Sequence, residues 1–254
     1  MCNDTGCAWG RRCVLVRFQW KYSLQSETRM KIPPVLPLSG PHGTINEGPR
    51  YAGCGTFYRD ALFSTLTELK PKFCLEIGTN TGHTAKVFQR YFEEYGSDEH
   101  VLITADIKIY VEMNYPNVKQ IQVYPHVNNI KDLHIVEDSD LIGGRVNQLE
   151  SVDKNIDIIR NVMEEKGISE IDFAFVDGDH QRESMLKDIE IAKSLVKSSG
   201  YILLDDIHDY VHESAKTFHD EIKLDSQYNC YEFEDWQDLL KGTGTAGSAL
   251  IWQT

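Results

Sequence analysis

The chain lacks several features that would place it in a large class of proteins. It contains no apolar run of the roughly 18 residues that a membrane-spanning helix needs. The N-terminus has no uninterrupted apolar segment of the kind that signal peptides carry, and there are no repeats or low-complexity tracts. Basic residues are outnumbered, 26 to 39, for a net charge of −13. A nucleic-acid partner is therefore not expected, because a phosphate backbone demands a basic face.

Cysteine is present without a metal-binding pattern. The 6 cysteines are scattered. The three nearest the N-terminus, Cys2, Cys7 and Cys13, do not have the CxxC spacing of a zinc-binding pair. Cys74 lies in a predicted buried strand, and together these features favour a reducing, cytoplasmic setting. Prolines between residues 33 and 41 predict an irregular connector. We therefore predict a partly flexible N-terminal extension over residues 1–50 and a folded domain over 51–254.

From residue 51 onward, helical and strand-like patterns alternate. Helices are predicted at 59–69, 84–91 and 155–166, over a segment that ends near Gly200, and at 213–222. Strands are predicted around Cys74 and at 101–106, 118–124, 171–176, 201–204, 228–233 and 249–252. The alternation predicts an α/β fold with a mainly parallel sheet and helices on both faces.

Acidic side chains follow two of the predicted buried strands. Asp177 follows one strand and opens the sequence Asp-Gly-Asp-His, and Asp205 and Asp206 follow the next. The carboxyl ends of parallel strands meet at the sheet edge where ligands bind, so these groups should converge. Two such charges repel by about 4 kcal/mol at 4 Å and an effective dielectric near 20, and a divalent cation relieves that repulsion. Asp179 could replace one of these ligands, but Asp177 is preferred because it leaves its strand first.

A glycine loop lies upstream, between the first predicted strand and a helix. Glu76, Gly78 and Gly82 are spaced E-x-G-x-x-x-G, and the glycines allow a tight turn and close approach to a ligand. The spacing differs from the dinucleotide fingerprint G-x-G-x-x-G. A carboxylate here would repel a pyrophosphate, which needs bare amides, so an amine-bearing cationic ligand is favoured. The alternative is that Glu76 only caps the loop.

The order of these motifs resembles a known family. The strand, glycine loop and helix, with Asp106 ending the next strand, resemble class I S-adenosylmethionine-dependent methyltransferases. Phe175-Val-Asp-Gly-Asp-His180 and Ile202-Leu-Leu-Asp-Asp-Ile207 resemble a narrower group, the metal-dependent macrocin-type sugar O-methyltransferases and the cephalosporin-hydroxylase-like proteins. The resemblance covers about residues 55–252, and 107–168 match poorly. It implies a three-layer Rossmann-like methyltransferase fold with a seven-stranded, mostly parallel sheet whose last strand is antiparallel.

The resemblance also implies roles for individual residues. The S-adenosylmethionine-binding residues would be Glu76, Gly78, Thr79, Asn80, Gly82, Asp106 and Asp177. Asp106 would hold the ribose, since its two acceptor oxygens suit a vicinal diol. Magnesium or another divalent cation would be bound by Asp177, Asp205 and Asp206. His180 lies three residues after Asp177 and would be the general base, since an imidazole titrates near neutral pH. The alternative for each aspartate is capping of the helix that follows it, and the alternative for His180 is a capping or supporting histidine that does not touch the acceptor.

We therefore predict an S-adenosylmethionine-dependent, metal-assisted O-methyltransferase. Its partner would be a small hydroxylated acceptor, a sugar or a diol-bearing metabolite, without a membrane or nucleic acid; a homo-oligomer remains open. A cephalosporin-hydroxylase-like protein and a catalytically silent S-adenosylmethionine-binding module are the alternatives. Elsewhere, His208 and His212 are spaced i, i+4, which suits a metal on a helix, but a solvated helix start is the preferred interpretation.

Overall fold

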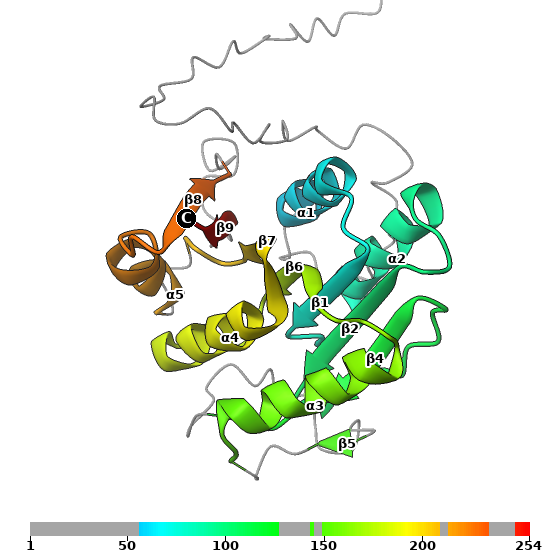
Figure 1. Cartoon of the computed structure of the whole chain (residues 1–254). Coiled ribbons are helices and arrows are strands. Elements are labelled where there is room, and N and C mark those ends of the chain that lie inside the picture. Colours follow the sequence, from blue (N-terminus) through cyan, green and yellow to red (C-terminus); the bar gives the residue numbers. More distant parts are fainter. Residues whose placement is uncertain (1–55, 127–142, 145–148, 209–212, 234–246) are drawn as a thin grey trace, which may run out of the picture. The chain divides into compact units, whose positions relative to one another are not determined.

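The computed structural model describes residues 56–126, 143–144, 149–208, 213–233 and 247–254 (Figure 1). All of them belong to one compact unit, Pro33–Thr254. The predicted extension over residues 1–50 lies outside the described residues. Among the helices of the described part, none has the length and apolar character needed to cross a bilayer.

The described elements follow the predicted alternation. The helices are α1 (Thr56–Leu69), α2 (His83–Tyr95), α3 (Val152–Glu165), α4 (Arg182–Leu195), α5 (Ser214–Thr217) and the π-helical turn η4 (Phe218–Ile222). The strands of the main sheet are β1 (Phe73–Ile77), β2 (Val101–Asp106), β4 (Val118–Gln122), β6 (Ile171–Val176), β7 (Val196–Leu204), β8 (Tyr228–Glu232) and β9 (Ala249–Gln253). Two short strands that the sequence did not predict, β3 (Lys108–Ile109) and β5 (Gly143–Gly144), form a separate antiparallel pair.

The main sheet has the strand order β4-β2-β1-β6-β7-β9-β8. Strands β4, β2, β1, β6 and β7 pair in parallel, and β9 inserts antiparallel between β7 and β8. Helices α1 and α2 lie on one face of the sheet, and α3 and α4 lie on the other (Figure 1). The predicted three-layer fold, with seven strands and an antiparallel last strand, is confirmed.

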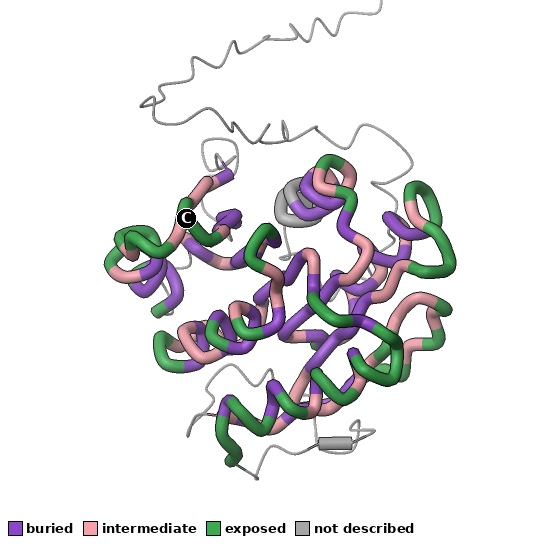
Figure 2. Tube along the Cα trace, in the orientation of Figure 1, coloured by how far each residue is buried: buried purple, intermediate pink, exposed green. Residues whose placement is uncertain are grey.

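The core lies along the central strands, which are buried in Figure 2 while the helices turn one side to solvent. Helix α2 buries Val87, Phe88, Tyr91 and Phe92, the three-to-four-residue spacing of an amphipathic helix. The central strands are buried on both faces, as parallel strands covered by helices are. This rigid layer fixes where the loops at the carboxyl edge begin.

Element boundaries differ from prediction where tertiary contacts intervene. Helix α4 ends at Leu195 rather than near Gly200, because Val196 turns to extended backbone (φ −77°, ψ 132°) and pairs with β6. Strand β4, predicted to continue to residue 124, ends at Gln122. Just beyond it, the main-chain N–H of Tyr124 donates to Asn155 Oδ1 and the Asn155 side-chain amide donates to the carbonyl oxygen of Tyr124, so Tyr124 pairs with a side chain instead of a strand. The helix predicted over 213–222 changes from α to π geometry at its middle.

Candidate active site

The glycine loop connects β1 to α2 at the carboxyl edge of the sheet. Gly78 (φ 97°), Asn80 (φ 45°) and Gly82 (φ 76°) all take left-handed or related backbone conformations, which cost an L-residue about 1–2 kcal/mol and a glycine little. The main-chain N–H of Asn80 donates to Asp106 Oδ2 at 2.7 Å. This bond holds the loop against the end of β2, the strand that pairs with β1 in the sheet.

Glu76 lies beneath this loop and is fully buried. Its Oε2 accepts a hydrogen bond from the Thr104 hydroxyl, which lies 2.5 Å from the hydroxyl of Thr79. Its Oε1 is buried and has no hydrogen-bond partner among the described residues. Burial raises the pKa of Glu76 well above its ordinary value, and the charges of Asp177 and Asp106 raise it further, against the Thr104 bond. A buried acceptor without a donor is an arrangement that a bound cationic group would complete.

Asp106 ends β2 with both carboxylate oxygens directed by the main chain. Oδ2 accepts from the N–H of Asn80, and Oδ1 accepts from the N–H of Lys108 at 3.1 Å. Burial raises the pKa of Asp106, and these backbone N–H groups oppose the rise. A carboxylate oxygen can accept more than one hydrogen bond, and the structure orients both oxygens of Asp106 at the end of β2.

Three side chains from two neighbouring strands meet at the same edge. His180 Nε2 lies 3.0 Å from Asp206 Oδ2 and 3.8 Å from Asp177 Oδ1, and one ligand atom from each residue falls within 4.8 Å of the others. Asp177 and His180 face the same space, and a loop brings them together, because α4 begins only at Arg182. Asp206 has φ 54°, an unfavourable value for a side chain that persists where surrounding contacts enforce it.

Asp205 points elsewhere. Its side chain is buried, 7% exposed, and Oδ1 accepts from the Ser248 hydroxyl at 2.9 Å. Burial raises the pKa of Asp205 well above its ordinary value, and the charges of Asp206 and Asp177 add to the rise. The group whose ligand atom joins Asp177 and Asp206 is thus His180 rather than Asp205. Whether Asp205 is the third metal ligand stays a prediction.

The glycine loop and the carboxylate cluster form one site. A Cβ atom placed on Gly78 would overlap the carbonyl oxygen of Asp177 and lie 2.9 Å from the N of Gly178. Adjacent strand ends are also bonded, from Asp177 N to Ile77 O at 2.8 Å and from Asp205 N to Val176 O at 3.1 Å. Close approach of a ligand was the expected reason for a glycine at position 78. The structure shows that the approach of two backbone segments already requires it.

Comparison with known proteins gives the family. A family model described as a methyltransferase domain matches residues 75–207, more than half of the chain. The chain belongs to this methyltransferase-domain family. The match contains the glycine loop, Asp106 and the whole carboxylate cluster. A search of curated protein sequences finds no match.

Solved structures of similar fold include two O-methyltransferases and a third, cofactor-bound protein. The O-methyltransferase TomG from Streptomyces achromogenes, in complex with SAM, is 14% identical over 78% of this chain and 79% of its own, with a TM-score of 0.48. The O-methyltransferase from Bacillus cereus, in complex with SAH, is 14% identical over 79% and 82%, with a TM-score of 0.48. Cofactor-bound Rv0187 from MTB is 15% identical over 82% and 84%, at 0.49. Likeness at this level carries no conclusion about mechanism.

Two residues that support the site of this methyltransferase were not identified from the sequence. Ser248 holds Asp205 across the β7–β9 pairing, 43 positions away. Asp188 in α4 lies beneath Gly178, where a Cβ atom would overlap its Oδ2, and its Oδ1 lies 3.2 Å from Nε2 of His126. No local pattern marks either residue. For Asp188 the available signal was Gly178, because a glycine at such a position indicates that another group approaches the backbone closely.

Proposed function

We propose that this methyltransferase transfers the methyl group of S-adenosylmethionine to a hydroxyl group of a small acceptor, with a divalent cation, magnesium by preference, at the carboxylate cluster. The observation that carries the proposal is the convergence of Asp177, His180 and Asp206 directly against the glycine loop. A cofactor above the loop and an acceptor at the cluster would then be neighbours, as a direct transfer between them requires.

The residues around the loop fit this cofactor. The buried, unpartnered Oε1 of Glu76 suits the ammonium group of an amino acid moiety. Asp106, with its two oriented oxygens, suits the vicinal diol of a ribose. Thr79 and Asn80 lie between them on the loop, and Gly78 and Gly82 give it its shape. Asp177 completes the predicted set, because its backbone lies against Gly78.

The cluster fits a hard divalent cation. Carboxylate oxygens are the preferred ligands of magnesium, and Asp177 and Asp206 offer them, with the buried carboxyl of Asp205 next in sequence. When bound, the cation supplies positive charge that acidifies the acceptor hydroxyl, and S-adenosylmethionine supplies the methyl group. His180 would receive the hydroxyl proton as the methyl group moves from the sulfonium sulfur to the acceptor oxygen, which leaves S-adenosylhomocysteine. The carboxylates beside His180 stabilise the imidazolium that results, because opposite charge favours the protonated form.

We infer the acceptor class from these ligands. A cation held by the carboxylates has further coordination positions open. Two adjacent oxygens of a sugar or a diol can fill two of these positions. This deepens the family assignment toward the macrocin-type sugar O-methyltransferases that the motifs resemble. A protein that binds the cofactor but turns over no diol would instead be a silent binding module.

Cofactor binding is tested by thermal unfolding with S-adenosylhomocysteine, since a ligand that binds only the native state raises its stability. We expect a rise in Tm with S-adenosylhomocysteine and none with NAD. Glu76→Gln should shrink the rise, because the neutral amide loses attraction for an ammonium group. Glu99→Gln is the matched control, since Glu99 is exposed and pairs with Lys72 outside the site. Stabilisation by NAD alone would overturn the cofactor proposal.

A further inference from the structure

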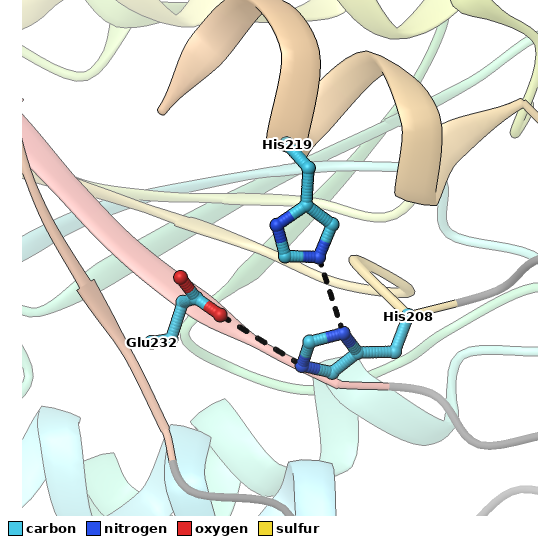
Figure 3. Close-up of side chains that lie close together, drawn as sticks. All are labelled: His208, His219 and Glu232. Carbon is cyan, nitrogen blue, oxygen red and sulfur yellow. Dashed lines mark hydrogen bonds and ion pairs between the residues drawn. The ribbon is translucent and has the colours of Figure 1, made fainter. Parts of the chain in front are cut away.

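A second group of metal-binding side chains lies beyond β7. His208 follows β7, His219 lies in η4, and Glu232 ends β8. The three side chains point toward a common space from these separate segments (Figure 3). His219 Nε2 lies 3.4 Å from His208 Nδ1, and Glu232 Oε2 lies 4.0 Å from His208 Nε2. One ligand atom from each residue falls within 4.8 Å of the others.

These distances are close to those of a zinc site. Zinc binds imidazole nitrogen and carboxylate oxygen at about 2.0–2.1 Å in tetrahedral geometry, which places two ligand atoms about 3.3–3.4 Å apart. The separation of the two histidine nitrogens already has this value. Glu232 Oε2 lies 4.0 Å from Nε2, the other ring nitrogen of His208, so the Glu232 side chain has to rotate to bring an oxygen to the position shared with the two histidines. Two histidines and a glutamate form a known zinc ligand set that leaves a fourth position for water.

The surroundings hold these three side chains in place. Lys223 pairs with Glu232 Oε1, leaving Oε2 as the oxygen that faces His208. The His208 ring packs on the backbone of Gly247, where a Cβ atom would overlap it, and Ile207 N donates to Gly247 O at 2.9 Å. The ring of Phe218, fully buried, lies edge-on to His219 at 5.0 Å. Partners of this kind orient metal ligands in protein sites.

The histidine pair differs from the one that the sequence suggested, His208 with His212. His208 lies in a turn before α5 rather than on a helix, and His212 lies outside the described residues.

We propose that His208, His219 and Glu232, each through one ligand atom within 4.8 Å of the other two, bind a zinc-class transition-metal ion, with water as the fourth ligand. The site differs in chemistry from the carboxylate cluster, because imidazole nitrogen selects zinc, nickel or copper whereas carboxylate oxygen suits magnesium. The ion would link the turn after β7, the η4 turn and β8. It would thereby stabilise the C-terminal part of the sheet, next to Asp205 and Asp206.

The test is a zinc titration of the metal-stripped full chain in excess magnesium. Calorimetry measures the stoichiometry and Kd of zinc binding, and thermal unfolding measures the change in Tm. We expect one zinc ion per chain. At a free zinc concentration about 100-fold above Kd, Tm should rise by about 5–10 °C. His219→Gln and Glu232→Gln should each weaken zinc binding by more than about tenfold. His100→Gln, which removes a histidine from the loop between α2 and β2, and Asp177→Asn, in the carboxylate cluster, should leave it unchanged.

A fourth variant tests the geometry without removing a ligand. Gly247→Ala should displace the His208 ring and weaken zinc binding while all three ligands remain. Cobalt(II) bound to the wild-type chain should give the visible absorption of a four-coordinate ion, a readout independent of the variants' stability. Zinc binding that His219→Gln and Glu232→Gln both leave intact would overturn the proposal, as would the absence of any zinc-dependent rise in Tm in the wild type. The hydrogen-bonded histidine pair would then be a packing contact only.

Discussion

Replacing Gly78 by alanine should destabilise the protein far more than a glycine-to-alanine change usually does. The chain offers a matched series, because Gly78, Gly82 and Gly167 all have positive φ but differ in what a new Cβ atom would meet. At Gly167 nothing lies within 4 Å. At Gly82 the nearest atom is Met113 Sδ at 2.6 Å, at the flexible end of a side chain. At Gly78 the obstacle is the backbone of Asp177 and Gly178.

The magnitudes follow from these surroundings. Left-handed backbone costs an L-residue about 1–2 kcal/mol, so Gly167→Ala should lower the free energy of unfolding by that amount. Gly82→Ala should cost about the same, because Met113 can rotate away. Gly78→Ala adds the cost of forcing apart packed groups that cannot yield, about 1–3 kcal/mol. Its total is about 2–5 kcal/mol, or a fall in Tm of about 5–15 °C for a chain of this size.

Urea unfolding of the four proteins, followed by circular dichroism, measures the differences directly. The midpoint should fall in the order wild type, Gly167→Ala and Gly82→Ala together, then Gly78→Ala, with similar m-values. Gly78→Ala should also lose magnesium-dependent activity, since Asp177 would be displaced. If Gly78→Ala were as mild as Gly167→Ala, the close approach of the β1 and β6 loops would be refuted, and Gly78 would serve only a ligand.

Other predictions concern the charged groups of the site. His180→Gln should lower kcat by about 10²- to 10⁴-fold while S-adenosylhomocysteine binding persists, the usual range for a lost general base; near wild-type kcat would leave the cation as the only activator. Asp206→Asn should remain folded, because asparagine tolerates positive φ, but it should lose magnesium-dependent turnover. Asp177→Asn should lose turnover in the same way, and the effects of the two substitutions should be far from additive in the double variant. Turnover that EDTA leaves unaffected would exclude the metal. Glu76→Gln should raise stability at pH 7: burial raises the pKa of Glu76 in the folded state, so its contribution is present below the unfolded pKa of about 4.3 and lost as the pH rises. Urea unfolding at pH 4 and pH 7 should show the advantage of the variant only at the higher pH.

Much of the fold was predictable from local sequence pattern. The strands predicted at Val101–Asp106 and Ile171–Val176 have the same bounds in the structure, because a short apolar run ending in a carboxylate is a strong local signal. Since parallel strands end at one edge, the meeting of Asp177 and Asp206 could be predicted from strand identity alone. Helix α4 shows the limit, since its apolar spacing continues past Leu195 while pairing with β6 converts Val196 to strand.

The amino-acid sequence by itself determined which residues form the strands, where the glycine loop lies and which carboxylates reach the sheet edge, because hydrophobic periodicity and chain order encode these. Only the tertiary structure decided that Asp205 turns to Ser248, that Gly78 lies against Asp177, and that His208 meets His219 and Glu232. Those contacts join residues from different elements: Gly78 and Asp177 meet because β1 pairs with β6, and Asp205 meets Ser248 because β9 inserts between β7 and β8. Side-chain direction across such a pairing has no local signature, since it is set by packing between elements.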